Sequence, residues 1–254
     1  MRITVLGKSP AWQDAGGACS GYLIEGGGAR VLLDCGPGVF AKLRAFVDYV
    51  DVDAVVISHL HADHVNDLVT FASALRYGTH PDTPPRLIVP PGAPEVLASL
   101  CAGGSMRAEH IAGAFALEAY DPTDTVDVGG LRMRFRPVPH FIPCNAVEVA
   151  EGGARMTFSA DCGPNDALVE FAADTGLLLV EATLPAPDEG HLTPFEAGEH
   201  GARAGAARCV LTHFSDQLDC AWVRTEGERG FGGPVELAVE GAAYELQSPP
   251  HLAD

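Results

Sequence analysis

Lysine is nearly absent from this sequence, in which Lys8 and Lys42 are the only two. Together, 16 lysine and arginine residues face 34 aspartate and glutamate residues among 254, and the formal net charge is −18. Binding to nucleic acid regardless of sequence needs cations that displace the counterions around phosphates, and anionic membranes attract basic segments. The charge balance therefore argues against both partners, although a compact basic patch would survive the average.

Long apolar runs and paired cysteines are also missing. No run approaches the ~20 residues of a membrane span, and the strand-like pattern at residues 2–6 leaves no room for the apolar region of a signal peptide. The seven cysteines are odd in number and include no Cys-X-X-Cys pair. We expect reduced thiols, each buried as a small apolar side chain, in a cytoplasmic protein.

The hydrophobic residues, 47% of the chain, fall into short segments of two kinds. Strand-like and helix-like patterns alternate along the sequence, which predicts an α/β fold. Strands are predicted at residues 2–6, 21–25, 30–34, 54–57, 86–89, 115–119, 131–138, 146–150, 155–159, 177–181, 208–212 and 242–246. Helices are predicted at residues 39–47, 67–77, 94–100, 166–173, 194–207 and 218–226.

The clearest helix start lies at Thr193-Pro-Phe-Glu196. Thr193 is a capping residue, proline suits the first helical position, and Glu196 completes a capping box. Three glycines inside the predicted helix each cost about 1 kcal/mol of helix propensity. We expect them to permit close packing against a sheet: Gly198, Gly201 and Gly205.

Four potential metal ligands follow a buried strand within six residues, in the segment His59-Leu-His-Ala-Asp-His64. His59 and His61 are two positions apart, so an extended segment projects them to the same side. A turn at Asp63 and His64 would aim these side chains at a second point. Imidazole and carboxylate groups suit zinc or a similar divalent ion. A polar loop without a ligand role is the alternative, but this density of ligand-type residues favours a metal site.

These residues resemble the metallo-β-lactamase superfamily, whose signature HxHxDH matches residues 59–64. The resemblance covers nearly the whole chain. Leu32-Leu-Asp-Cys-Gly-Pro-Gly38 is similar to the strand and glycine turn before the first helix of the family. Three further segments stand where the family places its third histidine, its bridging aspartate and its last histidine: Val138-Pro-His140, Ser159-Ala-Asp161 and Leu211-Thr-His213.

The resemblance implies a four-layer αβ/βα sandwich, as a single domain over residues 1–254, with metal ions at one edge between two sheets. It implies two divalent ions, with zinc as the first choice and manganese or iron as alternatives. One ion would take His59, His61 and His140. The other would take Asp63, His64 and His213, and Asp161 would bridge the two ions together with a water or hydroxide.

Two shorter motifs resemble the ribonuclease Z-like phosphodiesterases, namely Glu181-Ala-Thr183 and Gly190-His-Leu-Thr193. In that group the glutamate and the histidine cooperate to protonate the leaving oxygen, which an alkoxide leaving group requires. The candidate catalytic residues are therefore Glu181 and His191, with Asp63 as a third. A histidine that only stabilises the loop before a helix is the alternative for His191.

Within this branch, tRNA-processing enzymes carry a basic arm, and this sequence has no basic insertion that would serve as one. A subgroup of cyclic-nucleotide phosphodiesterases is more similar, through Cys19-Ser-Gly-Tyr-Leu23 and the ending around residues 235–246. The segment Phe141-Ile-Pro-Cys-Asn145 departs from that subgroup. We therefore expect a hydrolase of a small phosphodiester such as a cyclic nucleotide. The alternatives are a tRNA 3′-end endoribonuclease, a lactonase or thioesterase, and a non-catalytic metal-binding protein. The oligomeric state is open, with a homodimer as one option.

One basic cluster stands out, in the segment Arg132-Met-Arg-Phe-Arg136. Alternation in a strand would place Arg132, Arg134 and Arg136 on one face. A solvent-facing surface is the favoured interpretation, and a phosphate-contacting stripe leading toward the third ligand histidine is the alternative. Four further histidines are expected to be ordinary surface or loop residues: His80, His110, His200 and His251.

Overall fold

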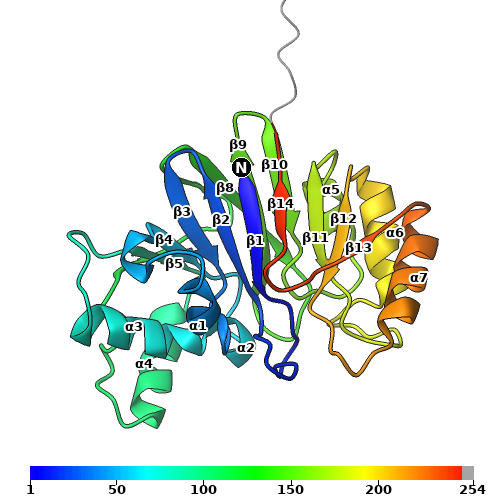
Figure 1. The fold of residues 1–254 in the computed structure, drawn as a ribbon. Helices are drawn as coiled ribbons and strands as arrows, with labels where there is room; N and C mark the ends of the chain where they lie inside the picture. The colour runs from blue at the N-terminus through cyan, green and yellow to red at the C-terminus, as the bar shows by residue number, and fades with distance from the viewer. Residues whose placement is uncertain (248–254) are drawn as a thin grey trace, which may run out of the picture.

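The computed structural model describes residues 1–247, which form two seven-stranded β-sheets packed face to face with helices on their outer sides (Figure 1). This arrangement confirms the predicted αβ/βα sandwich. His251 lies outside the described residues. Among the described residues, no helix is both long enough and apolar enough to cross a membrane.

The first sheet has the strand order β14-β1-β2-β3-β4-β5-β6. Neighbouring strands are antiparallel from β14 to β3 and parallel from β3 to β6. Its strands are β1 (Arg2–Gly7), β2 (Gly21–Gly26), β3 (Ala29–Leu33), β4 (Ala54–Val56), β5 (Arg86–Val89), β6 (Ala116–Ala119) and β14 (Ala243–Glu245).

The second sheet has the order β13-β12-β11-β10-β9-β8-β7. Its neighbours are antiparallel from β7 to β10 and parallel from β10 to β13. Its strands are β7 (Thr125–Val128), β8 (Leu131–Val138), β9 (Cys144–Glu151), β10 (Ala154–Phe158), β11 (Leu177–Glu181), β12 (Cys209–Thr212) and β13 (Glu236–Leu237).

Helices cover the outer faces, with α1 to α4 beside the first sheet and α5 to α7 beside the second (Figure 1). A short 3₁₀ helix, η1 (Tyr49–Asp51), precedes β4. The α-helices are α1 (Val39–Leu43), α2 (Ala62–Val65), α3 (Asp67–Tyr77), α4 (Ala93–Gly103), α5 (Asp166–Phe171), α6 (Pro194–Ala204) and α7 (Cys220–Phe231).

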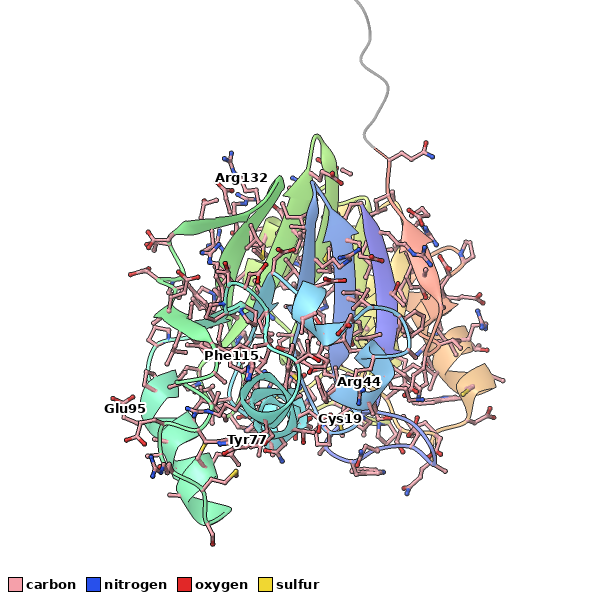
Figure 2. All side chains as sticks on the ribbon, turned by 60° about the vertical axis from the view of Figure 1, so that its left-hand side comes forward. Cys19, Arg44, Tyr77, Glu95, Phe115 and Arg132 are labelled. Atoms are coloured by element: carbon pink, nitrogen blue, oxygen red, sulfur yellow. The ribbon has the colours of Figure 1, made fainter. Side chains whose placement is uncertain are left out.

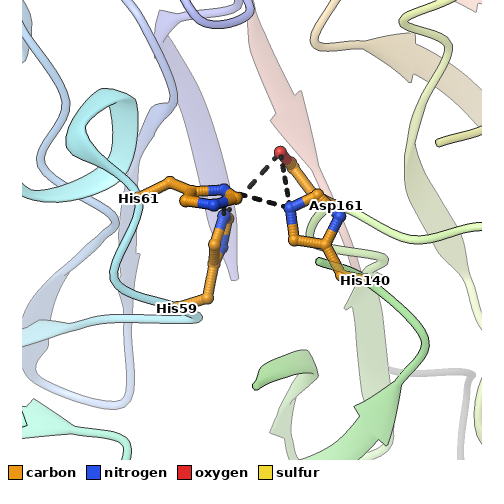
Figure 3. Close-up of side chains that lie close together, drawn as sticks. All are labelled: His59, His61, His140 and Asp161. Carbon is orange, nitrogen blue, oxygen red and sulfur yellow. Dashed lines mark hydrogen bonds and ion pairs between the residues drawn. The ribbon is translucent and has the colours of Figure 1, made fainter. Parts of the chain in front are cut away.

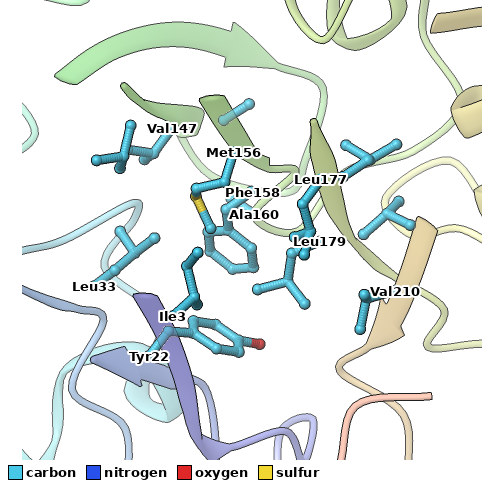
Figure 4. Packing of buried hydrophobic residues seen from close by; sticks show 14 of the residues in the cluster. Ile3, Tyr22, Leu33, Val147, Met156, Phe158, Ala160, Leu177, Leu179 and Val210 are labelled. Carbon is cyan, nitrogen blue, oxygen red and sulfur yellow. The ribbon is translucent and has the colours of Figure 1, made fainter. Parts of the chain in front are cut away.

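The strands β1 to β5 of the first sheet are buried on both faces, which explains their near-continuous apolar sequences, whereas the edge strands β6 and β14 are largely exposed. In β2, Tyr22 and Ile24 enter the core between the sheets, whereas Leu23 packs in the core toward the helices. Across the inner core the rings of Tyr22 and Phe158 meet with centroids 5.1 Å apart (Figure 4). Side chains from both sheets therefore form one continuous apolar core between the sheets.

Several element boundaries differ from the prediction. The helix expected at 218–226 is α7, which begins at Cys220 because the Asp219 side chain caps it. The helix expected at 39–47 ends at Leu43. The elements α2, η1, β7 and β13 were not predicted, since each is short and none carries a continuous apolar run like Ala54–Val56 of β4. Thr193 and Glu196 form the predicted capping box of α6.

The expected role of the α6 glycines needs correction. An ideal Cβ at Gly198 would lie 2.2 Å from the carbonyl oxygen of Gly227, so this glycine permits close approach to α7 and not to the sheet. Gly201 faces both Cys209 of β12 and α7. Gly205 ends the helix in a left-handed conformation, φ 66°. All seven cysteines are free thiols, but Cys220 is exposed rather than buried.

Candidate metal and catalytic site

The seven side chains predicted as metal ligands come together at one edge of the sandwich. Four of them follow β4 of the first sheet, and the other three follow β8, β10 and β12 of the second. Because α2 begins at residue 62, its first turn projects Asp63 and His64 toward this edge. Both halves of the molecule therefore contribute to one polar centre. The seven residues are His59, His61, Asp63, His64, His140, Asp161 and His213.

One group of facing atoms belongs to His59, His61, His140 and Asp161 (Figure 3). His61 Nδ1 lies 3.2 Å from His59 Nε2 and 3.0 Å from His140 Nε2. Asp161 Oδ2 lies 3.7 Å from His59 Nε2 and 3.9 Å from His140 Nε2. Three nitrogen atoms and one carboxylate oxygen thus face a common point.

A second group is formed by Asp63, His64, His213 and the same aspartate, all of them buried. His213 Nε2 lies 3.2 Å from Asp63 Oδ2 and 3.3 Å from His64 Nε2. Asp161 Oδ1 lies 3.4 Å from His64 Nε2 and 3.5 Å from His213 Nε2. The two oxygens of Asp161 therefore face different groups, as a bridging carboxylate would.

Backbone conformation supports this placement. Ala160, which precedes the shared aspartate, has φ 51°, and His213 itself has φ 55°. Non-glycine residues adopt positive φ values at a cost of about 1–3 kcal/mol and do so mostly at functional sites. Two strands of the second sheet therefore end in strained residues where the polar groups meet.

Outer hydrogen bonds fix the orientation of four of the imidazoles, including that of His59, whose Nδ1 lies 3.1 Å from Oγ of Ser58. His140 Nδ1 donates to the carbonyl of Gly190 at 2.8 Å, and His64 Nδ1 donates to Asp34 Oδ2 at 2.7 Å. The hydroxyl of Thr183 lies 3.0 Å from His213 Nδ1. Such partners select the tautomer of a metal-ligating histidine. They leave the opposite nitrogen of each ring turned toward the centre.

The donor set fits divalent cations. With Nδ1 occupied in His64 and His213, their Nε2 atoms face each other at 3.3 Å, and only a proton or a cation between them relieves the repulsion of two lone pairs. His140, whose Nδ1 is also engaged, turns its Nε2 toward Nδ1 of His61 at 3.0 Å. In addition, the buried Oδ1 of Asp161 has no hydrogen-bond partner. Buried polar atoms are rarely left without a partner, and here an ion would supply it.

Charges in the site follow from burial and from neighbours. Burial lowers the pKa of His59, His61 and His140 and favours the neutral form that ligates metals. Burial by itself would raise the pKa of Asp63 and Asp161, but the surrounding histidines outweigh it and lower both values. These pKa shifts favour the neutral form of those three imidazoles and the ionised form of the two carboxylates.

His64 differs from the other imidazoles. Its burial opposes the charged form, but the carboxylates of Asp161 and Asp34 outweigh that effect and raise its pKa. Asp34 also accepts hydrogen bonds from the backbone and side chain of Ser58, at 2.8 Å each. Sequence reasoning placed Asp34 only in a strand and turn. A carboxylate at the end of an otherwise apolar buried strand was the signal that could have singled it out.

The two predicted catalytic residues beyond the ligand set are in contact. His191 Nδ1 lies 3.0 Å from Glu181 Oε1, and Glu181 is fully buried while the His191 side chain is 17% exposed. Burial lowers the pKa of His191, but the hydrogen bond and charge of Glu181 outweigh burial and raise it. The His191 ring lies 4.9 Å from that of His140 and 6.2 Å from that of His213, between centroids. A histidine with a stabilised proton therefore borders both groups of ligands.

The arginine cluster lies on the outer face of the second sheet, as alternation predicted. Arg132, Arg134 and Arg136 are exposed, whereas Met133 and Phe135 enter the core (Figure 2 shows Arg132 at the surface). Arg132 pairs with Asp127, and Arg134 with Glu148. The outward placement and the ion pairs favour the surface interpretation.

Two of the histidines expected to be surface or loop residues are buried, His110 in a turn and His200 in α6. His110 accepts or donates a hydrogen bond with Ser73 at 2.9 Å, and His200 Nε2 accepts one from the backbone of Asn165 at 3.0 Å. Each is a satisfied structural histidine away from the candidate centre. Sequence alone did not reveal their burial, because their neighbours come from distant segments.

Fold and site together define a metallo-hydrolase of the metallo-β-lactamase type. Residues 29–214 match the beta-lactamase superfamily domain, and the chain belongs to that superfamily.

Three similar proteins illustrate the relationship. The metallo-beta-lactamase fold protein YhfI of Bacillus subtilis is 28% identical over 249 residues, which cover 96% of this chain and 100% of that protein. Its crystal structure matches with a TM-score of 0.85 over 96% of this chain and 99% of that one. Ribonuclease Z of Mycolicibacterium paratuberculosis is 29% identical, covering 98% and 99% of the two chains. The short form of human tRNase Z shares the fold, with a TM-score of 0.76 at 21% identity over 97% and 100% of the two chains.

Proposed function

We propose that this metallo-hydrolase cleaves a small phosphodiester, such as a cyclic nucleotide, with two divalent metal ions. The observation that carries the proposal is the sharing of Asp161 between two groups of ligand atoms that His191 borders. His59, His61 and His140 would hold one ion and Asp63, His64 and His213 the other. When bound, such ions supply Lewis-acid charge that polarises a phosphoryl oxygen and favours ionisation of water. The imidazole-rich donor set suits zinc, with manganese and iron as alternatives.

The chain itself would supply the proton for the leaving oxygen. Because Nδ1 of His191 is engaged by Glu181, Nε2 is the atom left to hand over a proton. Glu181 keeps the imidazole charged before transfer. Hydrolysis of a lactone or thioester would use the same metals but would give the His191–Glu181 pair no comparable role. In a non-catalytic metal-binding protein this pair would have no role at all.

The direct test is hydrolysis of bis(p-nitrophenyl) phosphate by protein loaded with zinc or manganese, with metal content measured by elemental analysis. We expect metal-dependent turnover and two ions per chain. Asp161→Asn should reduce the occupancy of both sites, whereas His213→Ala should weaken mainly one. Turnover that survives full removal of metal, or protein that takes up far less than one ion per chain, would overturn the proposal.

The relative named ribonuclease Z favours a second candidate, an RNA endonuclease. The net charge of −18 and the ion pairs of Arg132 and Arg134 in β8 oppose it, because RNA binding depends on free cations. Precursor tRNA should therefore be cleaved poorly relative to a small diester. Efficient, salt-sensitive cleavage near the 3′ end would replace the first proposal with this one.

The seven free thiols support a reducing compartment such as the cytoplasm. The cytoplasmic location and the homodimer both stay predictions.

A further inference from the structure

Phe141 lies beside the candidate site with its side chain 64% exposed. It follows His140 in the connection between β8 and β9. Its ring centroid is 5.1 Å from that of His140 and 5.8 Å from that of His191. A large apolar surface is thus presented next to both a candidate ligand and the candidate proton donor.

The position of this ring is set by packing against the opposite loop. An ideal Cβ at Gly190 would lie 2.4 Å from Cζ of Phe141, so the tip of the ring rests on the Gly190 backbone. The carbonyl of that glycine accepts the hydrogen bond from His140 Nδ1. Gly190 therefore contacts both Phe141 and the candidate ligand His140, and the ring of Phe141 is packed against this loop instead of projecting freely into solvent.

Other exposed apolar side chains in residues 1–247 do not share this setting. Tyr77, at the end of α3, has its ring next to that of His110. Phe46, which follows α1, lies near Gly241. Isolated apolar residues at a surface are ordinary. The combination of exposure, fixed packing and ring contacts to the candidate site distinguishes Phe141 from them.

We propose that Phe141 is a specificity-determining residue, a platform for a planar group on the alcohol that leaves the phosphate. The inference rests on the proposed function, because it takes His191 as the donor to the leaving oxygen. The departing alcohol must then lie beside His191, and its substituent comes within reach of the ring of Phe141. Stacking on an aromatic ring accepts any nucleobase, since every base has a π-face. The substrate class is therefore a phosphodiester of a nucleoside, with little preference among bases.

Binding of two phosphate monoesters to the metal-loaded protein tests this inference. Adenosine 5′-monophosphate and methyl phosphate present the same phosphate on different alcohols, and isothermal titration calorimetry gives both dissociation constants. For Phe141→Ala we expect adenosine monophosphate to bind about 5- to 150-fold more weakly, the loss that accompanies removal of one base stack. Methyl phosphate should bind as it does to the wild type. Phe141→Tyr should retain the affinity for the nucleotide, and Phe46→Ala is the matched control for loss of an exposed phenylalanine.

Two results would overturn the inference. Equal affinity of the wild type and Phe141→Ala for the nucleotide would show that the ring makes no contact with it. An equal loss for both monoesters would show that Phe141 only supports the loop. Either result leaves the proposed hydrolysis of bis(p-nitrophenyl) phosphate intact, whereas absence of that hydrolysis with normal nucleotide discrimination would refute the proposed function alone.

Discussion

The two carboxylate oxygens of Glu181 are connected to two different histidines, one directly and one through the hydroxyl of Thr183. Oε1 meets Nδ1 of His191, and Oε2 accepts the hydroxyl proton of Thr183 at 2.5 Å. That hydroxyl has one proton, so its oxygen accepts Nδ1–H of His213 in turn. One buried charge is therefore linked both to the candidate proton donor and to a candidate metal ligand.

Replacing the proton donor should affect substrates according to their leaving groups. For His191→Ala we expect about 10²- to 10⁴-fold slower hydrolysis of a diester with an alkoxide leaving group, the usual contribution of general acid catalysis. Hydrolysis that releases p-nitrophenolate should slow much less, because that anion leaves without protonation. Glu181→Gln should follow the same pattern more weakly. The measurement is kcat for both substrates with metal content determined in parallel.

Equal slowing of both substrates at full metal occupancy would assign His191 to substrate positioning. A drop in metal content would instead make the residue structural.

Thr183 should act through His213. Thr183→Val keeps the shape of the side chain but removes the hydroxyl that links Glu181 to His213. We expect one of the two metal affinities to fall about 10- to 100-fold, as is typical for loss of an outer partner of a ligand. Thr183→Ser, which retains the hydroxyl, is the control. Competition with a chelator measures both affinities, and identical values for the valine and serine variants would contradict the role.

The site was predictable only in part at this scale. His59 to His64 are close in sequence, so their types and spacing predict a shared centre. The contacts of Asp34 with His64 and of Thr183 with His213 join segments 30 residues apart. No local pattern reports such contacts, because they depend on how the strands are ordered in the sheets.

Among the elements, α6 and α7 approach each other through their glycines. An ideal Cβ at Gly198 would meet backbone atoms of α7 at 2.2 Å and 2.8 Å, and backbone cannot move aside as a flexible side chain can. We expect Gly198→Ala to destabilise the fold by about 1–3 kcal/mol, the usual effect of overpacking. Gly103→Ala in α4 is the control, since nothing lies within 4 Å of its Cβ position. Urea unfolding of both variants measures the difference, and equal midpoints would refute the explanation.

Asp14 holds the loop between β1 and β2 in place through an ion pair and a hydrogen bond. Its carboxylate, 11% exposed, pairs with Lys8 and accepts the backbone N–H of Asp216 at 2.9 Å. Burial alone would raise its pKa, but these partners outweigh burial and hold the pKa of the carboxyl below its usual range. The contact therefore stabilises the folded state above about pH 4, and the stabilisation is lost as the pH falls through the lowered pKa.

Asp14→Asn should accordingly cost about 1.5–3 kcal/mol at pH 6, the range for hydrogen bonds to charged groups. The difference from the wild type should shrink at pH 3. Urea unfolding at the two pH values checks the sign, and a difference that grows on acidification would refute it.

Long elements were easier to predict than short ones. β8 alternates arginine with apolar residues over positions 131–136 and was predicted with its bounds. β7, next to it at the sheet edge, has four residues of which one is buried. β7 forms because it pairs with β8. Its four residues alone show too little hydrophobic periodicity to predict a strand.

At the scale of the whole molecule, the candidate centre joins the two halves of the sandwich. Bound ions would stabilise the folded state by about 4 kcal/mol per site at a free concentration 1,000-fold above the dissociation constant. For a chain of this size that corresponds to about 8–16 °C in Tm for each site, or about 16–32 °C for both sites together. We expect a chelator to lower Tm by such an amount in the wild type and by much less in Asp161→Asn. Thermal unfolding followed by circular dichroism provides the measurement, and a Tm that chelation leaves unchanged in the wild type would contradict it.

The pairing of β14 with β1 has a consequence for biosynthesis. Arg2 pairs with Glu245, so one edge of β1 finds its partner only after all the residues between β1 and β14 have been translated. At about 5–20 residues per second, that edge stays open for roughly 12–50 s. An unpaired edge is a template for association with other strands. The nascent protein therefore presents an edge that favours aggregation until β14 emerges.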